Sequence, residues 1–223
     1  VFGDWSSDVC SSDLEKKCIW IHAVSVGEVN ATKTLISALE KEFAGYEVVL
    51  SATTDTGYAR AKAIYGDSLS VFYYPYDFSF IVSRAFKRLD PALCILMELE
   101  VWPNFVSYAR RHKVPVVVVN GRLSEKSFPR YKLVRAAAKW MFNKVTLFLV
   151  QTKEYAERFV ELGTDASKGI VTSSLKYDTA KGADKVSGFD ELAKQLCVGG
   201  KRLWVVGRSE ESRVGKACRS RVS

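Results

Sequence analysis

The amino-acid sequence predicts an α/β fold, in which a doubly wound parallel sheet is covered by helices on both faces. Short runs rich in Val, Ile and Leu alternate with segments of helical periodicity at a steady spacing. Each run is of strand length, and the longest, at 114–119, is far below the roughly 18 apolar residues of a membrane span. Continuous apolar strands separated by crossover helices indicate parallel strands that are buried on both sides.

The elements are expected to alternate along the chain. The first strand, at 18–24, is followed by a helix at 27–43, in which Val29, Ile36 and Leu39 recur at helical spacing. By the same two patterns, further strands are expected at 47–51, 69–73, 92–97, 115–119, 145–150 and 169–172. Further helices are expected at 56–65, 78–89, 102–112, 131–142 and 154–162.

The composition is that of a basic globular protein. Its 48% hydrophobic and 26% charged residues exclude a disordered or fibrous chain. The 223 residues contain 33 Lys and Arg against 25 Asp and Glu, which gives a formal net charge of +8 and a pI of about 9.2. This surplus suits nucleic acid, an anionic membrane surface or a phosphorylated substrate. Nucleic-acid binding would call for aromatic residues interleaved with Lys and Arg on an exposed surface. The tyrosines at 73, 74 and 76 lie instead at a strand end, where core or cleft residues are expected, so nucleic acid is not expected as a partner.

The cysteines indicate a reduced protein. There are five of them and no CxxC pair, so no zinc or other metal site is predicted. Cys18, Cys94 and Cys197 are expected to be buried thiols in a cytosolic protein.

The two ends differ in pattern from the middle of the chain. Residues 1–14 (VFGDWSSDVCSSDL) and 208–223 (RSEESRVGKACRSRVS) show neither helical nor strand periodicity. We interpret both as sequence foreign to the fold, the alternative being a mobile native tail at each end.

Polar segments follow the predicted strands where each strand ends. In a doubly wound sheet, ligands bind beyond the carboxyl ends of the strands, so these segments are expected to meet at one ligand-binding edge. The first turn contains Gly27 but no GxGxxG, and GK[ST] occurs nowhere, which argues against a nicotinamide or flavin enzyme and against a P-loop. The segments are HAVSVGE (22–28), SATTDTG (51–57), ELEVWPN (98–104) and NGRLSEKS (120–127).

Acidic residues in two of these turns have both a functional and a structural interpretation. Glu28, beside Gly27, is either a general base at the ligand edge or a carboxylate in the first turn of a helix, where its negative charge interacts favourably with the helix dipole. Glu98 and Glu100 precede Pro103, so one of them is a candidate to satisfy the first amides of the next helix. The pair as metal ligands is the weaker interpretation, because hard cations need more oxygen ligands.

The other polar residues carry weaker signals. The segment 51–57 offers hydroxyls and amides either to an anion at a helix start or simply as an N-cap. Arg122 is either a bidentate clamp for a phosphate or carboxylate, or a solvated loop residue. His22 and His112 are expected to be structural, since neither has an evident Ser or Asp partner in the turns, and Lys176 by itself indicates little.

Taken together, the motifs WIHAVSVGEV, SATTDTG, MELEVWPN, NGRLSEKS and SSLKYD, in this order, closely resemble the N-terminal half of the 3-deoxy-D-manno-octulosonic acid (Kdo) transferases. The resemblance covers residues 18 to about 180. It implies a glycosyltransferase of the GT-B type, in which the active site lies between two Rossmann-like domains. It further implies transfer of Kdo from CMP-Kdo to the lipid A precursor in lipopolysaccharide biosynthesis, with inversion and without a metal or other cofactor.

The resemblance also assigns roles to residues. It implies that Glu28 is the general base, and that Glu98 and Lys176 stabilise the transition state. It implies a membrane setting as well, at the cytoplasmic face of the bacterial inner membrane, whereas the chain as given is expected to be soluble. The residues expected to contact substrate are Ser25, Gly27, Thr54, Gly57, Asn120, Arg122 and Ser124.

The resemblance implies a division into domains, and the chain departs from the family at several points. Residues 15–175 are expected to form the acceptor-side domain, and 176–207 a linker and the start of a truncated donor domain, with KRLWVVG (201–207) as its first strand. The family's apolar anchoring segment is replaced by VFGDWSSDVC, and Ser173 and Ser174 stand where the family has Gly-Asn. We therefore expect the chain to be inactive alone.

Two other functions stay open at this stage. One is another GT-B enzyme that uses a different nucleotide sugar, although the VGEV and SLKYD turns discriminate against it. The other is a non-catalytic basic α/β domain that binds anionic lipid.

Overall fold

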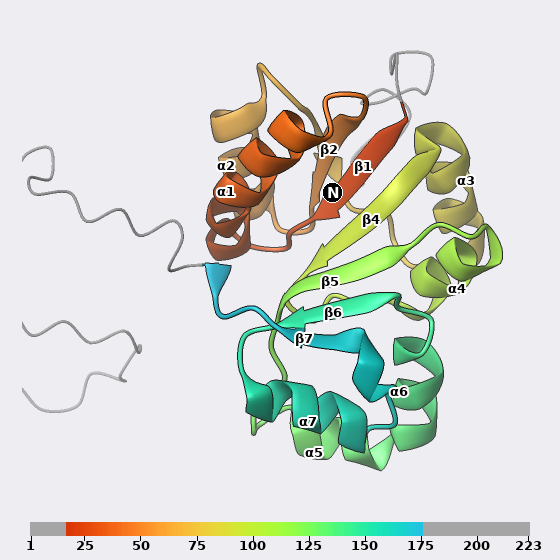
Figure 1. Ribbon diagram of the computed structural model, residues 1–223. Helices are drawn as coiled ribbons and strands as arrows, with labels where there is room; N and C mark the ends of the chain where they lie inside the picture. Colours follow the sequence, from red (N-terminus) through yellow and green to blue (C-terminus); the bar gives the residue numbers. More distant parts are fainter. Residues whose placement is uncertain (1–16, 176–223) are drawn as a thin grey trace, which may run out of the picture. The chain divides into compact units, whose positions relative to one another are not determined.

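The computed structural model describes residues 17–175, which lie within the first of two units into which the chain divides, Val1–Lys181. Seven strands in this part form one sheet in the order β3-β2-β1-β4-β5-β6-β7 (Figure 1). Every neighbouring pair is parallel. The strands are β1 (Cys18–His22), β2 (Glu47–Ala52), β3 (Ser70–Tyr73), β4 (Pro91–Met97), β5 (Val116–Gly121), β6 (Leu147–Val150) and β7 (Gly169–Val171).

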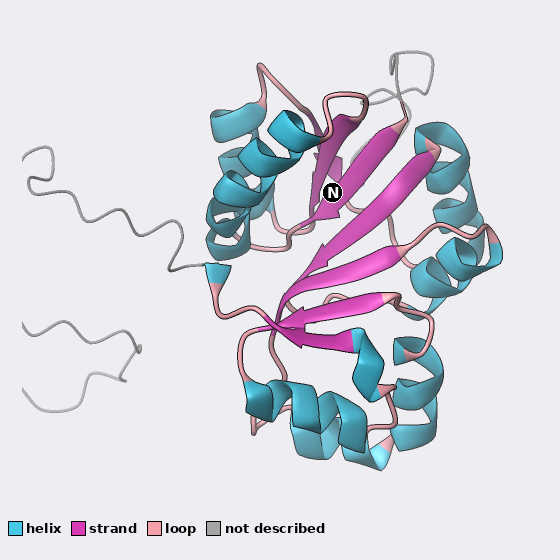
Figure 2. Cartoon of the chain, viewed as in Figure 1, coloured by secondary structure: helices cyan, strands magenta, loops and turns pink. Residues whose placement is uncertain are grey.

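Helices cover both faces of this sheet (Figure 2). The side chains of α1 and α2 pack on one face, and those of α3, α4, α6 and α7 pack on the other. The predicted doubly wound parallel α/β fold is therefore confirmed. The helices are α1 (Val26–Glu42), α2 (Asp55–Tyr65), α3 (Ser79–Leu89), α4 (Pro103–Arg111), α5 (Phe128–Leu133), α6 (Arg135–Phe142) and α7 (Lys153–Glu161), with a 3₁₀ turn, η2, at Ala166–Lys168.

The strand order reverses beside β1. The chain moves outward from β1 to β2 and β3, then returns to place β4 on the free side of β1. The connection after β1 runs to one face of the sheet and the connection after β4 to the other. The position between these two strands is therefore a topological switch point, and doubly wound sheets bind ligands at such points.

One predicted helix is wrong in its extent. The pattern at 131–142 predicts a single helix, but the structure has α5 and α6, separated at Val134, whose ψ of 33° is not helical. The helix α5 begins at Phe128, before the predicted first residue, and Pro129 lies in its first turn, where proline is favoured. Apolar periodicity continues through the break, so periodicity alone does not reveal it; the β-branched Val134 is a weak helix former at that point.

Aromatic side chains build the core on the α3 and α4 face. Trp20 of β1 is buried, and its ring lies within 5.0 Å of Phe105 and 5.5 Å of Phe86, measured between centroids. Its indole N–H donates to Ser51 Oγ at 2.8 Å, so the polar end of the ring is satisfied inside the sheet. The opposite face is filled mainly by Val, Ile and Leu from β1, β2 and α1.

The buried thiols agree with the prediction. Cys18 and Cys94 are buried and free, and burial raises the pKa of Cys18 to about 12, so it is an inert thiol in this fold. Cys197 lies outside the described residues.

Two glycines in the predicted site differ in what surrounds them. A Cβ on Gly57 would lie 2.6 Å from the backbone oxygen of Val24 and 2.8 Å from Thr54 Oγ1. A Cβ on Gly27 would meet only Ser25 Oγ, at 3.9 Å. Gly57 is thus required for close packing of α2 against the turn after β1, whereas Gly27 is not required by packing.

We predict that Gly57→Ala lowers the free energy of unfolding by about 1–3 kcal/mol, because the turn after β1 has to shift to admit the methyl group. Gly27→Ala is the matched control and is expected to leave stability unchanged or to raise it by up to about 1 kcal/mol, since alanine favours the helix. Urea denaturation of the three proteins measures both effects. Equal losses in the two variants would contradict this account of Gly57.

Candidate functional site

Three carboxylates from two turns approach one another at the switch point. Glu28 follows β1, and Glu98 and Glu100 follow β4, which is paired with β1. The charge of Glu98 raises the pKa of Glu28, and the charges of Glu28 and Glu98 both raise the pKa of Glu100. The prediction that the turns after the strands share one edge is therefore confirmed for these two.

Glu28 is held at both of its oxygens. Ser25 is the N-cap of α1, and its hydroxyl donates to Glu28 Oε1 at 3.0 Å, while the Val24 N–H donates to Oε2 at 2.9 Å. Burial raises the pKa of Glu28 above its usual value, and these hydrogen bonds reduce the effect without removing it. The carboxylate of Glu28 thus connects the first turn of α1 to the residues that precede the helix. It also has the elevated basicity that a general base needs.

The segment after β4 places its two glutamates differently. Glu98 has a φ of 54°, in the left-handed region, and its N–H donates to Val119 O at 2.9 Å, which ties the turn to β5. Glu100 Oε2 accepts from the indole N–H of Trp102 at 3.2 Å. Burial is the main cause of the raised pKa of Glu100.

Neither glutamate is seen to cap the next helix, and that structural interpretation is wrong. The amides at the start of α4 donate instead to Asp77, from Asn104 to Oδ2 at 2.9 Å and from Phe105 to Oδ1 at 2.8 Å. Asp77 follows β3, far from α4 in the sequence, so local spacing gave no signal for this cap.

The 51–57 segment is used structurally. Thr54 is the N-cap of α2: its Oγ1 accepts from the Gly57 N–H at 3.1 Å and its hydroxyl donates to Val24 O at 2.8 Å. Thr54 and Gly57, predicted to contact substrate, therefore also fasten α2 to the turn that carries Glu28. The N-cap interpretation of this segment is the one that these contacts support.

His22 is structural, as predicted, but the expectation that it lacks a serine partner is wrong. It is fully buried and stacked on Tyr74, and its Nδ1 lies 3.1 Å from Ser51 Oγ, because the register of β1 and β2 pairs the two residues. Burial lowers the pKa of His22 to about 3, so it is neutral. His112 stacks on Tyr108 at the end of α4, consistent with a structural role.

Asn120 connects the edge of β5 to the chain that precedes Lys176. It is 1% exposed with a φ of 59°, and its Oδ1 accepts the Leu175 N–H at 3.2 Å. Among the described residues, its buried Nδ2 has no hydrogen-bond partner. Asn120, predicted as a substrate contact, thus also holds the backbone one residue before Lys176, which itself lies outside the described residues.

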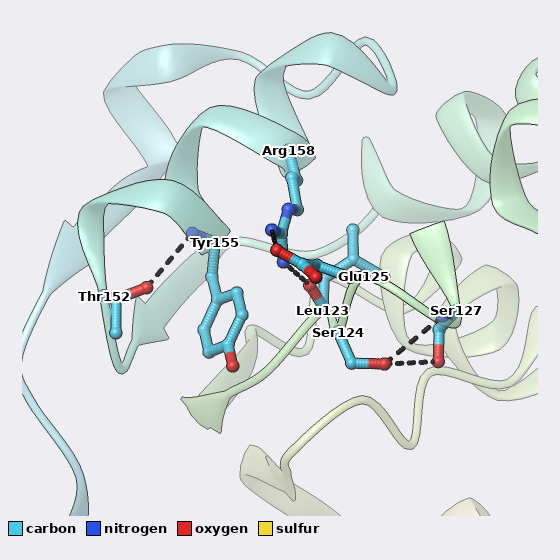
Figure 3. A network of polar contacts seen from close by, with 7 residues as sticks. All are labelled: Leu123, Ser124, Glu125, Ser127, Thr152, Tyr155 and Arg158. Carbon is cyan, nitrogen blue, oxygen red and sulfur yellow. Dashed lines mark hydrogen bonds and ion pairs between the residues drawn. The ribbon is translucent and has the colours of Figure 1, made fainter. Parts of the chain in front are cut away.

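The loop after β5 is anchored by an arginine that sequence reasoning missed (Figure 3). Arg158 of α7 donates from Nη1 to Leu123 O at 2.7 Å and from Nη2 to Glu125 Oε1 at 3.3 Å. Ser124 is occupied locally, because its Oγ accepts from the Ser127 N–H at 3.2 Å and lies 3.0 Å from Ser127 Oγ. Arg122 projects from this anchored loop as an exposed side chain.

Residues 17–175 contain neither a metal-binding cluster nor a membrane-spanning helix. No group of three or more His, Cys, Asp or Glu side chains there is arranged to hold a metal ion. None of the helices in that part is long and apolar enough to cross a membrane.

The fold is that of a Rossmann-like domain of the GT-B kind, and solved UDP-GlcNAc 2-epimerases share it. The UDP-GlcNAc 2-epimerase of Neisseria meningitidis superimposes with a TM-score of 0.54 and 11% identity, over 72% of this chain and 48% of that one. The corresponding enzyme of Methanocaldococcus jannaschii gives a TM-score of 0.54 and 12% identity, over 80% and 52%. At such identities the likeness shows the fold alone.

Sequence comparison gives the family. The family described as 3-deoxy-D-manno-octulosonic-acid transferase (kdotransferase) matches residues 4–179. The Kdo transferase of Haemophilus influenzae is 33% identical over 187 residues, which are 84% of this chain and 44% of that protein. That of Bordetella pertussis is 35% identical over 167 residues, or 73% and 38%. The chain belongs to the Kdo transferase family, as its motifs indicate.

The extent of these matches bears on the domain predictions. The chain spans less than half the length of these two relatives. The family match begins within residues 1–14, so the foreign origin of that segment stays a prediction, as do the boundaries at 175 and 207.

We predict that Glu98→Gln lowers the pKa of Glu28 toward its usual value, because it removes a neighbouring negative charge. The raised pKa means that the folded state binds this proton more tightly than the unfolded state, so stability falls as pH rises above 4.5 through the raised value. Carboxyl NMR titration measures the shift. Glu42→Gln, at the far end of α1, is the control, and an equal shift there would contradict the proximity.

We predict that Arg158→Gln destabilises the domain by about 1.5–3 kcal/mol, because it weakens a charged hydrogen bond to the Leu123 carbonyl. Glu125→Gln removes only the exposed partner and is expected to cost less than about 1 kcal/mol. Urea denaturation distinguishes the two. If Glu125→Gln cost as much as Arg158→Gln, the ion pair and not the carbonyl contact would hold the loop.

Proposed function

We propose that the glycosyltransferase whose acceptor-side domain this chain forms transfers Kdo from CMP-Kdo to the lipid A precursor, with inversion and without a metal or other cofactor. The observation that carries the proposal is Glu28: in a domain of this family, a half-buried carboxylate with a raised pKa lies at the ligand edge of the sheet. The acceptor is an acylated, bisphosphorylated glucosamine disaccharide.

Glu28 acts as the general base. Its carboxylate takes the proton of the acceptor hydroxyl, whose oxygen forms a bond to the anomeric carbon of Kdo. The bond from that carbon to the CMP phosphate oxygen breaks, and the electron pair leaves with CMP. Attack opposite the leaving group inverts the anomeric centre. A carboxylate with a raised pKa is better suited to this task near neutral pH than an ordinary one.

Glu98 supports the base electrostatically. An anion does not assist an anionic leaving group, but the charge of Glu98 raises the pKa of Glu28 and favours the positive charge that develops on the sugar ring. The left-handed turn and its hydrogen bond to Val119 fix Glu98 for this role. Ser25 orients the carboxylate of Glu28 through its hydroxyl.

Positive charge for the departing phosphate comes from Lys176 and Arg122. Arg122 is exposed on the loop that Arg158 anchors, and the backbone of Leu175 is fixed by Asn120 one residue before Lys176. A cation beside the leaving phosphate stabilises the charge that develops there. The protein works on the cytoplasmic face of the bacterial inner membrane, where the donor is soluble and the acceptor is embedded.

We predict that a protein extended to the length of its relatives transfers Kdo from CMP-Kdo to the lipid A precursor, whereas this chain alone does not. In the extended protein, Glu28→Gln is expected to lower kcat by about 10²–10⁴-fold, because it removes the base. Glu42→Gln, on the same helix, is the control, and circular dichroism checks that all variants fold.

Undiminished transfer by the Glu28→Gln variant would overturn the assignment of the base. Transfer of a sugar from a UDP donor instead of CMP-Kdo would favour another GT-B enzyme. If the folded, extended protein bound the acceptor but used no donor, the non-catalytic lipid-binding domain would be the better description.

A further inference from the structure

Three residues at the carboxyl edge of the sheet have a left-handed backbone although none of them is glycine. Glu98, Asn120 and Ser173 have φ values of 54°, 59° and 66°. They lie at or just after the ends of β4, β5 and β7. A left-handed backbone is uncommon for residues other than glycine, and where it occurs it gathers at functional sites whose surroundings hold it in place. The contacts that hold this part of the edge therefore bear on its function.

The strand β5 is irregular where Asn120 lies. Its pairing with β6 shifts register between Val118 and Gly121, and an irregularity of this kind redirects the side chain that lies within it. The Asn120 side chain is buried, and its Oδ1 accepts the Leu175 N–H at 3.2 Å. Its backbone oxygen accepts from Gln151 Nε2, also at 3.2 Å. One residue of β5 is thus joined both to the segment after β6 and to the segment after β7.

The chain after β7, residues 172–175, here named the strap, passes the carboxyl ends of β6 and β5 (Figure 1). At its start, the Thr172 N–H donates to the last carbonyl of β6 at 2.9 Å. At its end, the Leu175 N–H donates to Asn120, and the half-buried Leu175 side chain packs against the core on the α1 face of the sheet. Ser173, with its left-handed backbone, lies between these two contacts. The strap is therefore held first by β6 and then by Asn120.

Among the described residues, the strap is the only polar partner of the Asn120 side chain. Its Oδ1 is used by Leu175, whereas its Nδ2 is buried and has no hydrogen-bond partner there. A buried donor that is left unsatisfied costs about 1–3 kcal/mol. The polar contribution of this side chain to the edge is therefore made through the strap.

We propose that Asn120 is a positioning residue for the transfer reaction, and that it acts through the strap and not by direct contact with a substrate. Its Oδ1 fixes the Leu175 amide, and because consecutive Cα atoms are about 3.8 Å apart, fixing one residue restricts its neighbour. The next residue in the sequence is Lys176, to which the proposed function gives the positive charge beside the departing phosphate. This effect on the reaction rests on the proposed function, but the hold on the strap does not.

Amide hydrogen exchange of this chain, followed by NMR, tests the hold on the strap without any sugar transfer. Asn120→Gly removes the side chain and keeps the left-handed backbone, which glycine adopts freely. We expect protection of the Leu175 N–H to fall about fivefold to tenfold, which corresponds to the loss of one hydrogen bond. The Gln151 N–H, which donates to Gly121 O, is the control and is expected to keep its protection.

A second variant separates the two ends of the Asn120 amide. Asn120→Asp keeps an acceptor oxygen but lacks the Nδ2 donor, so we expect it to keep most of the protection of the Leu175 N–H. Unchanged protection of Leu175 in Asn120→Gly would overturn the hold on the strap. Equal loss at Leu175 and Gln151 would overturn it too, because the whole edge would then have loosened.

Kinetics of the extended protein test the effect on the reaction. Asn120→Gly is expected to lower kcat about tenfold or more and to change KM for the acceptor less than about twofold, because a misplaced group slows the reaction without weakening substrate binding. Leu175→Pro removes the same hydrogen bond from the other side, and Leu175→Ala loses the side chain but keeps the N–H. We expect Leu175→Pro to lower kcat further than Leu175→Ala does. Asn120→Gly combined with Leu175→Pro is expected to be no slower than the slower single variant.

The outcomes separate this proposal from its alternatives. A raised KM with unchanged kcat in Asn120→Gly would indicate direct contact with a substrate and overturn the positioning role. Fully additive losses in the double variant would overturn it as well, and circular dichroism checks that each variant is folded. If the unaltered extended protein transferred no Kdo while Asn120→Gly still released the Leu175 amide, the proposed function would be overturned and the hold on the strap would stand.

Discussion

The parallel pairing of β1 with both β2 and β4 is the constraint on which the rest of this domain depends. One side of β1 fixes the start of the outward path through β2 and β3, and the other side receives the returning chain. Because β1 and β4 are adjacent and parallel, the turns after them are neighbours at the carboxyl edge, and the helices that follow depart to opposite faces of the sheet. Trp20, buried in the middle of β1, packs this junction and also hydrogen-bonds to β2 through Ser51.

The consequence of that pairing is an electrostatic cost at the edge. Burial is the main cause of the raised pKa of Glu28 and of Glu100, and the charges of the neighbouring carboxylates, Glu98 among them, raise both values further. Such an arrangement adds nothing to the stability of the core, and groups of carboxylates with raised pKa values are typical of functional sites. Most other polar residues at the same edge serve to hold it together: Thr54 fastens α2, Asp77 fastens α4, and Asn120 fastens the chain at Leu175.

The half-buried carboxylates and the exposed apolar side chains near the carboxyl edge of the sheet have a common structural origin. The carboxylates follow the strand ends, while the exposed Phe80 and Trp102 lie at the amino ends of α3 and α4, and the exposed Leu133 lies between α5 and α6. In a parallel sheet each crossover helix runs antiparallel to the strands it connects, so helix starts lie at the same edge as strand ends.

The sequence by itself determined the fold class, the alternation of elements and, through five motifs in register, the family. These features depend on local patterns: apolar runs set strands, periodicity sets helices, and the motifs lie within single turns. It also identified Glu28 and Glu98 as candidate residues, because their positions after predicted strands follow from the same local pattern.

Only the tertiary structure decided which residues are partners. The cap of α4 by Asp77, the contact of His22 with Ser51 and the anchoring of Leu123 by Arg158 join residues that are distant in the sequence. The break at Val134 was likewise seen only in the structure, since the apolar spacing continues through it. Hydrogen bonds and burial depend on strand order and helix packing, and a linear pattern states which side chains face inward without stating what they meet there.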